Sequence, residues 1–106
     1  MPDERRKTDR SVLERTKPQT VEPDLYAVIL LNDDYTTMEF VVQVLESVFK
    51  KQPAEAFRIM MLVHTTGQGV CGTYPFDVAE TKVGAVHELA ADRGFPLRAV
   101  IEKTTG

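Results

Sequence analysis

The apolar side chains that can build a core are confined to one part of this chain. All three tyrosines and all five phenylalanines lie after residue 23. Residues 1–23 hold six Lys or Arg, five Asp or Glu and three of the six prolines, and only Val12, Leu13 and Val21 are candidates for burial. So little apolar surface does not offset the conformational entropy lost on ordering. The sequence therefore predicts a flexible, disordered N-terminal extension over residues 1–23 and one folded domain over residues 24–106.

Charge and cysteine content narrow the class of protein. The formal net charge is −3, whereas nucleic-acid binding favours a basic surface, so no nucleic-acid partner is expected. The longest apolar run, residues 27–31, is far too short for a membrane span, and no secretion signal is recognisable. A single cysteine, Cys71, excludes an internal disulfide and favours a reducing compartment. We expect a cytoplasmic, monomeric protein with no membrane partner.

Hydrophobic periodicity divides residues 24–106 into six elements. Short runs rich in β-formers predict strands at residues 25–31, 70–74 and 97–103. Apolar residues at helical spacing predict helices that start near residues 36, 53 and 77, and the second helix is apolar nearly all round, which predicts that it is largely buried. The order β-α-α-β-α-β predicts an α+β fold, in which a three-stranded antiparallel sheet carries three helices packed on one face.

Polar residues and glycines mark the expected helix ends. Thr36 with Glu39, and Asp77 with Glu80, have the spacing of the capping box that begins helices. Glycines follow the second and third helices, and Gly94 is the expected stop of the third.

Three polar residues, Asn32, Asp33 and Asp34, stand between a predicted strand and a predicted helix. Such residues commonly bind local backbone groups in turns, so a purely structural role is one interpretation. His64 closes the second helix, where a structural histidine or a partner of the helix dipole is the commoner role. A binding site that uses both groups is the alternative interpretation.

Helical spacing adds apolar neighbours to these polar groups. Met60, Val63 and His64 share one face of the second helix, while Met38 and Val41 begin the apolar stripe of the first. Methionines in such positions often fill gaps in a core. If the two faces meet, they form a small apolar pocket with an Asn, Asp and His rim.

Nothing in the sequence assembles a catalytic or metal centre. Cys71 lies between Val70 and Gly72 in a predicted strand, so a buried thiol is more plausible than a nucleophile. A metal site from Asp33, Asp34, His64 and His87 matches none of the known ligand spacings, and no glycine-rich phosphate loop is present. We expect no enzymatic activity, no metal and no cofactor, and a small hydrolase that uses Asp34 and His64 is the weakest alternative.

Several blocks of sequence at fixed spacing resemble one known family. They are residues 28–41 (VILLNDDYTTMEFV), 61–64 (MLVH) with Gly67, Cys71-Gly72, 78–83 (VAETKV), and Pro96-Leu97 with Glu102. Together they resemble the bacterial ClpS adaptor family from about Tyr26 to Glu102.

The resemblance implies a function in protein degradation. Members of this family recognise substrates with an N-terminal Leu, Phe, Tyr or Trp and deliver them to the ClpA unfoldase of the ClpAP protease. The family's extension is engaged by the unfoldase during delivery, so the same role is implied for residues 1–23. The alternative is a regulator that binds the unfoldase and modulates its substrate choice, with weak or narrowed recognition of N-terminal degrons.

The resemblance also implies roles for individual residues. Those expected to hold the α-amino group of the degron are Asn32, Asp33, Asp34 and His64. Those expected to line the side-chain pocket are Leu31, Thr36, Met38, Val41, Met60, Val63 and Leu97, with Met38 as a gate that refuses β-branched side chains. Those expected to contact the N-terminal domain of the unfoldase are Asp77 and Lys82.

Three positions depart from the family pattern. Thr37 stands where the family commonly has proline, Asp77 replaces the usual glutamate, and Phe95 stands where many members carry a polar residue. These differences fit a divergent second bacterial paralogue.

Overall fold

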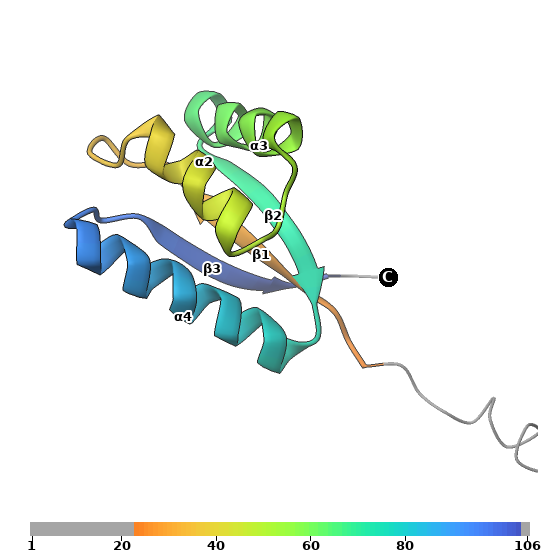
Figure 1. Ribbon diagram of the computed structural model, residues 1–106. Coiled ribbons are helices and arrows are strands. Elements are labelled where there is room, and N and C mark those ends of the chain that lie inside the picture. Colours follow the sequence, from red (N-terminus) through yellow and green to blue (C-terminus); the bar gives the residue numbers. More distant parts are fainter. Residues whose placement is uncertain (1–22, 105–106) are drawn as a thin grey trace, which may run out of the picture.

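The computed structural model describes residues 23–104, which form six elements in the predicted order (Figure 1). They are β1 (Tyr26–Leu31), α2 (Met38–Ser47), α3 (Pro53–Thr66), β2 (Gln68–Tyr74), α4 (Phe76–Arg93) and β3 (Arg98–Lys103). The predicted extension lies outside the described residues, except for Pro23.

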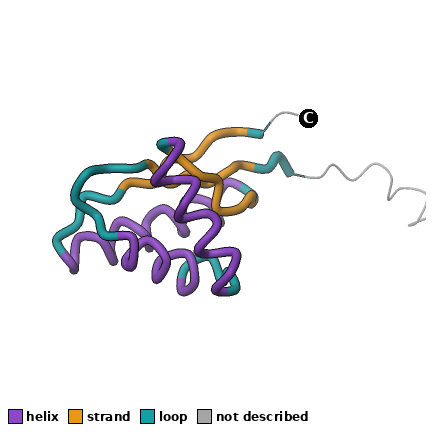
Figure 2. Tube along the Cα trace, turned by 90° about the horizontal axis from the view of Figure 1, so that it is seen from above, coloured by secondary structure: helices purple, strands orange, loops and turns teal. Residues whose placement is uncertain are grey.

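The sheet has the order β2-β1-β3, and both pairs of neighbouring strands are antiparallel. Val28 and Leu30 on the central strand are fully buried and join a single core cluster with Leu45 of α2, Ile59 of α3 and Val86 of α4. Figures 1 and 2 show the helices gathered on one side of the strands, with α3 along the β2 edge. The predicted α+β fold and antiparallel sheet are confirmed.

The prediction that α3 is largely buried is wrong for one of its faces. The buried residues of this helix are Ala56, Ile59, Met60 and Val63. In contrast, Phe57 is 56% exposed and Leu62 is 37% exposed. A helix at the edge of a three-stranded sheet has too little protein around it to cover every side, so apolar side chains remain at its surface.

The first capping prediction is wrong by one residue. Helix α2 begins at Met38, and its N-cap is Thr37, whose hydroxyl accepts a hydrogen bond from the Phe40 N–H at 3.1 Å. Thr36 instead belongs to the acidic turn, where its N–H and hydroxyl both donate to Asp33. Of the two adjacent threonines, Thr37 caps α2 and Thr36 binds Asp33.

The second capping prediction is also wrong. Helix α4 begins at Phe76 after Pro75, so Asp77 lies inside the first turn. Its carboxylate accepts a hydrogen bond from the adjacent Val78 N–H, and its negative charge is favourable at the positive end of the helix dipole. The expected stop at Gly94 is confirmed by a left-handed backbone there, with φ of 76°.

Strand β2 contains an irregularity that buries Cys71. Val28 pairs with Gly72 and Ile29 with Val70, so Cys71 is the extra residue of a β-bulge. Its side chain is 1% exposed, and burial raises the pKa of its thiol to about 12. The thiol is therefore protonated near neutral pH and acts as a small apolar side chain, as the sequence predicted.

A left-handed glycine ties the end of α3 to the end of β1. Gly67 has φ of 100° and its N–H donates to the Val63 carbonyl at 3.0 Å. The Gly67 carbonyl in turn accepts a hydrogen bond from the Asn32 N–H at 2.9 Å. The residues after β1 and those at the C-terminus of α3 are thereby held next to each other. Within the described residues, no helix has the length and apolar character that crossing a membrane requires.

Replacing Gly67 tests this junction. Gly67→Ala places a Cβ in the left-handed region, which should lower the free energy of unfolding by about 1–2 kcal/mol. The matched control is Gly84→Ala on α4, where the backbone is helical and a Cβ would have no neighbouring atom within 4 Å. In that helix interior alanine should raise stability by about 0.5–1 kcal/mol. Urea denaturation measures both, and equal effects of the two changes would contradict the role given to Gly67.

Candidate functional site

The acidic turn after β1 is held together by Asp33. Its Oδ1 accepts hydrogen bonds from the Tyr35 and Thr36 N–H groups at 2.8 and 2.7 Å, and its Oδ2 accepts one from the Thr36 hydroxyl at 2.8 Å. Partial burial raises the pKa of Asp33, but the hydrogen bonds from Thr36 and Tyr35 outweigh it, so the pKa lies below its ordinary value. Asp33 is therefore an anion whose two oxygens both shape the turn.

Beside this turn is a cavity of about 230 Å³ formed by the β1–α2 connection, the start of α2 and the end of α3. It is lined by Asn32, Asp33, Asp34, Thr36, Met38, Val41, Met60, Val63 and His64. All nine are residues that the sequence indicated for one site. The predicted meeting of the two apolar helix faces under an Asn, Asp and His rim is therefore present in the structure.

The floor and the rim of this cavity differ in chemistry. Val41, Met60 and Val63 on the floor are each at most 6% exposed. Asn32, Asp34 and His64 at the rim are exposed, and their side chains make no hydrogen bond or ion pair within residues 23–104. An amide oxygen, a carboxylate and a neutral imidazole nitrogen are all acceptors. Such a rim suits a cationic N–H donor whose attached apolar group occupies the floor.

Two residues expected in the pocket lie elsewhere. Leu31 lines a neighbouring cavity of about 240 Å³, together with Asn32, Asp33, Pro96 and Arg98. Leu97 is 3% exposed and belongs to the core cluster. Neither leucine is among the residues that line the 230 Å³ cavity.

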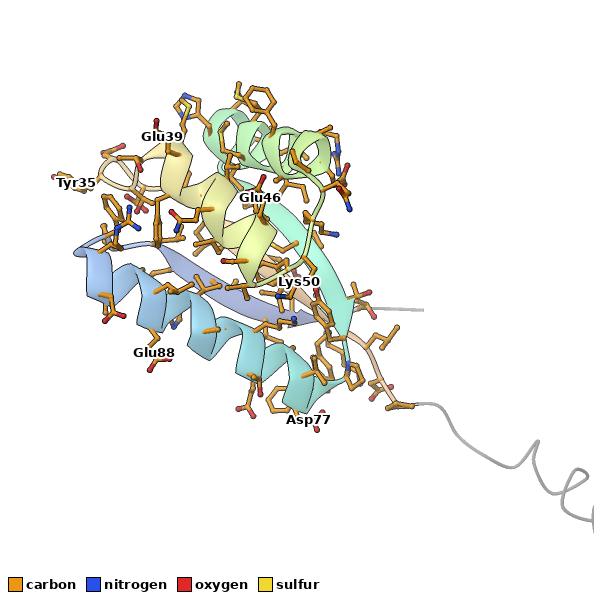
Figure 3. All side chains as sticks on the ribbon, in the orientation of Figure 1. Tyr35, Glu39, Glu46, Lys50, Asp77 and Glu88 are labelled. Atoms are coloured by element: carbon orange, nitrogen blue, oxygen red, sulfur yellow. The ribbon has the colours of Figure 1, made fainter. Side chains whose placement is uncertain are left out.

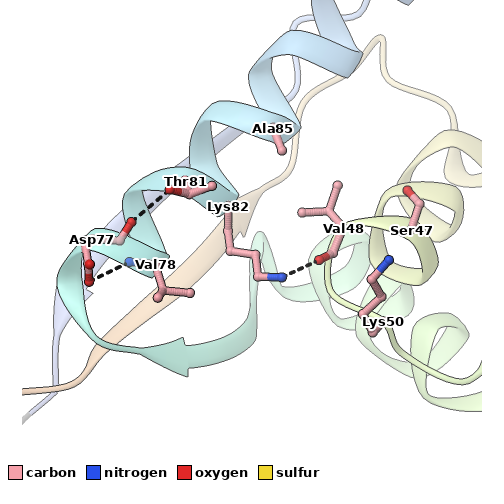
Figure 4. Close-up of a pocket in the computed structure, with 8 residues that line it drawn as sticks. All are labelled: Ser47, Val48, Lys50, Asp77, Val78, Thr81, Lys82 and Ala85. Carbon is pink, nitrogen blue, oxygen red and sulfur yellow. Dashed lines mark hydrogen bonds between the residues drawn. The ribbon is translucent and has the colours of Figure 1, made fainter.

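Asp77 and Lys82 meet at a second hollow, of about 510 Å³, between α4 and the end of α2 (Figure 4). The Lys82 Nζ donates to the Val48 carbonyl at 2.8 Å and lies 5.6 Å from the centre of the Tyr74 ring. Because Val48 is the C-cap residue of α2, this bond satisfies a carbonyl at the helix end and joins α2 to α4. Asp77 has no such tether and is exposed.

The two hollows lie at different ends of the molecule. Figure 3 shows Tyr35 of the acidic turn at one end and Asp77, at the start of α4, at the other. A ligand in the first cavity and a partner protein at the second hollow would therefore not compete for space.

The residues considered for a metal site do not converge. Asp33, Asp34 and His64 line the first cavity, whereas His87 on α4 accepts a hydrogen bond from the Ala99 N–H of β3 at 3.0 Å. No group of three or more potential ligands is found within residues 23–104.

The fold and the cavity define a small α+β binding domain, and comparison with known proteins identifies its family. A family model described as "ATP-dependent Clp protease adaptor protein ClpS" matches residues 21–100. The adapter protein ClpS of Wolinella succinogenes is 57% identical over 82 residues, which cover 77% of this chain and 80% of the relative. That of Parvibaculum lavamentivorans is 49% identical over 109 residues, covering 97% of this chain and 99% of the relative.

A solved structure supports the same assignment. The structure of Agrobacterium tumefaciens ClpS2 bound to L-phenylalaninamide is 42% identical to this chain, with a TM-score of 0.76, and the match covers 78% of this chain and 100% of that one. The chain belongs to the ClpS family of ATP-dependent Clp protease adaptor proteins. The resemblance seen in the sequence is confirmed.

Replacing Asp33 and replacing Asp34, the two aspartates of the turn, should change the free energy of unfolding by different amounts. Asp33→Ala removes three hydrogen bonds to a partly exposed carboxylate and should lower the free energy of unfolding by about 1–3 kcal/mol. Asp34→Ala removes none within the described residues and should stay within about 0.5 kcal/mol. Because the pKa of Asp33 is lowered from 3.8, its contribution is present above that pH and is lost as pH falls through the lowered pKa. Urea denaturation at pH 7 and at pH 3 measures this, and equal losses for both variants at pH 7 would contradict it.

Proposed function

We propose that this protein binds the free α-amino group and the large apolar side chain of proteins that begin with Leu, Phe, Tyr or Trp. It delivers them to the ClpA unfoldase of the ClpAP protease, in the cytoplasm. The observation that carries the proposal is a cavity whose buried apolar floor lies under the Asn32, Asp34 and His64 acceptors, which have no partner within residues 23–104. The ligand of the Agrobacterium relative supports it, because phenylalaninamide combines a free amino group with a benzyl side chain.

The energetics favour chain ends over internal residues. An α-amino group has a pKa of about 7.7–8.0 and is largely cationic near neutral pH. Each hydrogen bond to a charged group contributes about 1.5–3 kcal/mol, and burial of one large apolar side chain adds about 1.5–3 kcal/mol. After the cost of association, two or three such bonds and one side chain correspond to an affinity near 1 µM, to order of magnitude. An acetylated or internal residue presents no cation to Asn32, Asp34 and His64.

The two aspartates of the turn have different parts in this proposal. Asp34 is exposed with a free carboxylate, so it meets the amine directly. Asp33 uses both oxygens on Tyr35 and Thr36, so it positions the turn and adds a negative charge at short range.

In this proposal Met38 acts as the gate. It is the first residue of α2, lines the cavity, and is 43% exposed at the cavity mouth. The Thr37 cap fixes where the helix starts, which fixes the direction in which the Cα–Cβ bond of Met38 points. A substrate branched at Cβ is widest where it would pass Met38, whereas Leu and Phe branch farther along.

Delivery is assigned to the second hollow. Asp77 contributes an exposed carboxylate, while the Lys82 ammonium is held against the Val48 carbonyl. The N-terminal domain of the unfoldase would contact this surface while the substrate stays in the cavity at the other end. No step of this activity requires a catalytic residue.

The first test measures peptides that differ only at residue 1. Fluorescence anisotropy with N-terminal Leu, Phe, Ile and acetylated Phe should show micromolar binding of Leu and Phe, with at least about tenfold weaker binding of the other two. Asp34→Ala should weaken the binding of Phe by at least about tenfold, with a change in stability of no more than about 0.5 kcal/mol. Equal binding of acetylated Phe would refute amine capture, and equal binding of Ile would refute the gate. Binding of none would favour the regulator alternative.

The second test separates delivery from recognition. Asp77→Ala should leave peptide affinity within about twofold but reduce adaptor-dependent degradation of an N-terminal-Phe substrate by ClpAP, because only the unfoldase contact is altered. Glu88→Ala is the matched control, since Glu88 is an exposed carboxylate of the same helix outside the hollow (Figure 3). If ClpAP degrades the substrate at the wild-type rate with both variants, Asp77 is not part of the contact.

A further inference from the structure

A second apolar cavity adjoins the proposed degron site. It has a volume of about 360 Å³, lies between α2 and α3, and is lined by Met38, Glu39, Val42, Phe57 and Met60. Phe57 is 56% exposed and is the largest side chain in it. Four of its five lining residues are apolar. Glu39 and Phe57 are both exposed to solvent.

The two cavities share part of their walls. Met38 and Met60 line both, so this methionine pair separates the 230 Å³ cavity from the 360 Å³ cavity. Of this pair, Met60 is buried, with 4% of its surface exposed, whereas Met38 is 43% exposed. A chain that leaves the first cavity over Met38 therefore enters the second directly.

We infer that this α2–α3 cavity binds an apolar side chain at residue 2 or 3 of the substrate, so that the protein reads more than the first residue. The inference rests on the proposed function, because residue 1 must first be held in the degron cavity. An extended chain advances about 3.3–3.6 Å per residue, so residues 2 and 3 lie within reach of a cavity that shares a wall with the first.

The chemistry of the lining sets which side chains it accepts. Phe57 presents an aromatic ring, and flexible methionines adapt to ligands of different shape. Leu, Met and aromatic side chains should therefore all be accepted at residue 2 or 3. Partial burial of one such side chain should tighten binding by about three- to tenfold over glycine, which is a modulation of affinity rather than a strict requirement.

The experiment uses the full chain and three labelled peptides that all begin with Phe. Their next two residues are Gly-Gly, Leu-Gly or Gly-Leu, and the remaining sequence is identical. Fluorescence anisotropy should show that one Leu-containing peptide binds about three- to tenfold more tightly than the Gly-Gly peptide. Phe57→Ala should reduce this difference to less than about twofold and leave the affinity of the Gly-Gly peptide unchanged.

A matched variant controls for general effects. Leu89 on α4 is 38% exposed and lines neither cavity, so Leu89→Ala should preserve the preference for Leu. Phe57→Leu should also keep part of the preference, because an apolar surface remains. Absence of any preference in the wild-type protein, or a preference that survives Phe57→Ala, overturns the inference.

The outcomes distinguish this inference from the proposed function. If the Gly-Gly peptide itself fails to bind, capture of the first residue is wrong and the α2–α3 cavity loses its ligand with it. If that peptide binds and the Leu peptides bind equally well, only the role of the α2–α3 cavity is wrong. Sedimentation of the wild-type protein as a dimer that Phe57→Ala dissociates would mean that a second copy covers the cavity, which also overturns the inference.

Discussion

The site depends on one backbone junction, in which the Asn32 N–H donates to the Gly67 carbonyl at 2.9 Å. Asn32 follows the central strand and Gly67 ends α3, so this bond joins segments 35 residues apart in the chain. The left-handed backbone of Gly67 turns α3 back into β2 immediately after His64 and directs its carbonyl at the acidic turn. The backbone positions of Asn32, Asp34 and His64 are thereby held next to one another, while their side chains make no hydrogen bond or ion pair within residues 23–104.

Periodicity was sufficient for the architecture because each element buries one regular set of side chains. Val28 and Leu30 alternate on β1, and Val41, Val44 and Leu45 repeat at helical spacing on α2. The helix ends were less accessible to sequence reasoning. Thr36 and Thr37 have the same hydroxyl chemistry, and only the bonds of Thr36 to Asp33 show which of them is left to cap α2.

The same limit applies to the candidate site. Nine of its predicted residues line one cavity, but sequence could not separate Asp33, whose carboxylate is used in the turn, from Asp34, whose carboxylate has no partner within residues 23–104. Nor did it show that Leu97 is enclosed by the core, since a leucine at a strand start has the same pattern in either place. Spacing identifies residues that belong together, whereas the hydrogen bonds show which of them, such as Asp33, build the turn.

The exposed side chains Phe57 and Leu62 show why the apolar composition of α3 alone was misleading. A helix that is apolar nearly all round is expected to be buried, yet this helix lies at the edge of a sheet of only three strands. Its inner face completes the core through Ile59 and Val63, and its outer face leaves Phe57 at the surface beside Met38. In a domain this small, apolar residues beyond the capacity of the core have to lie outside it. Phe57 is one of these residues, and the cavity that it lines shares Met38 and Met60 with the proposed degron cavity.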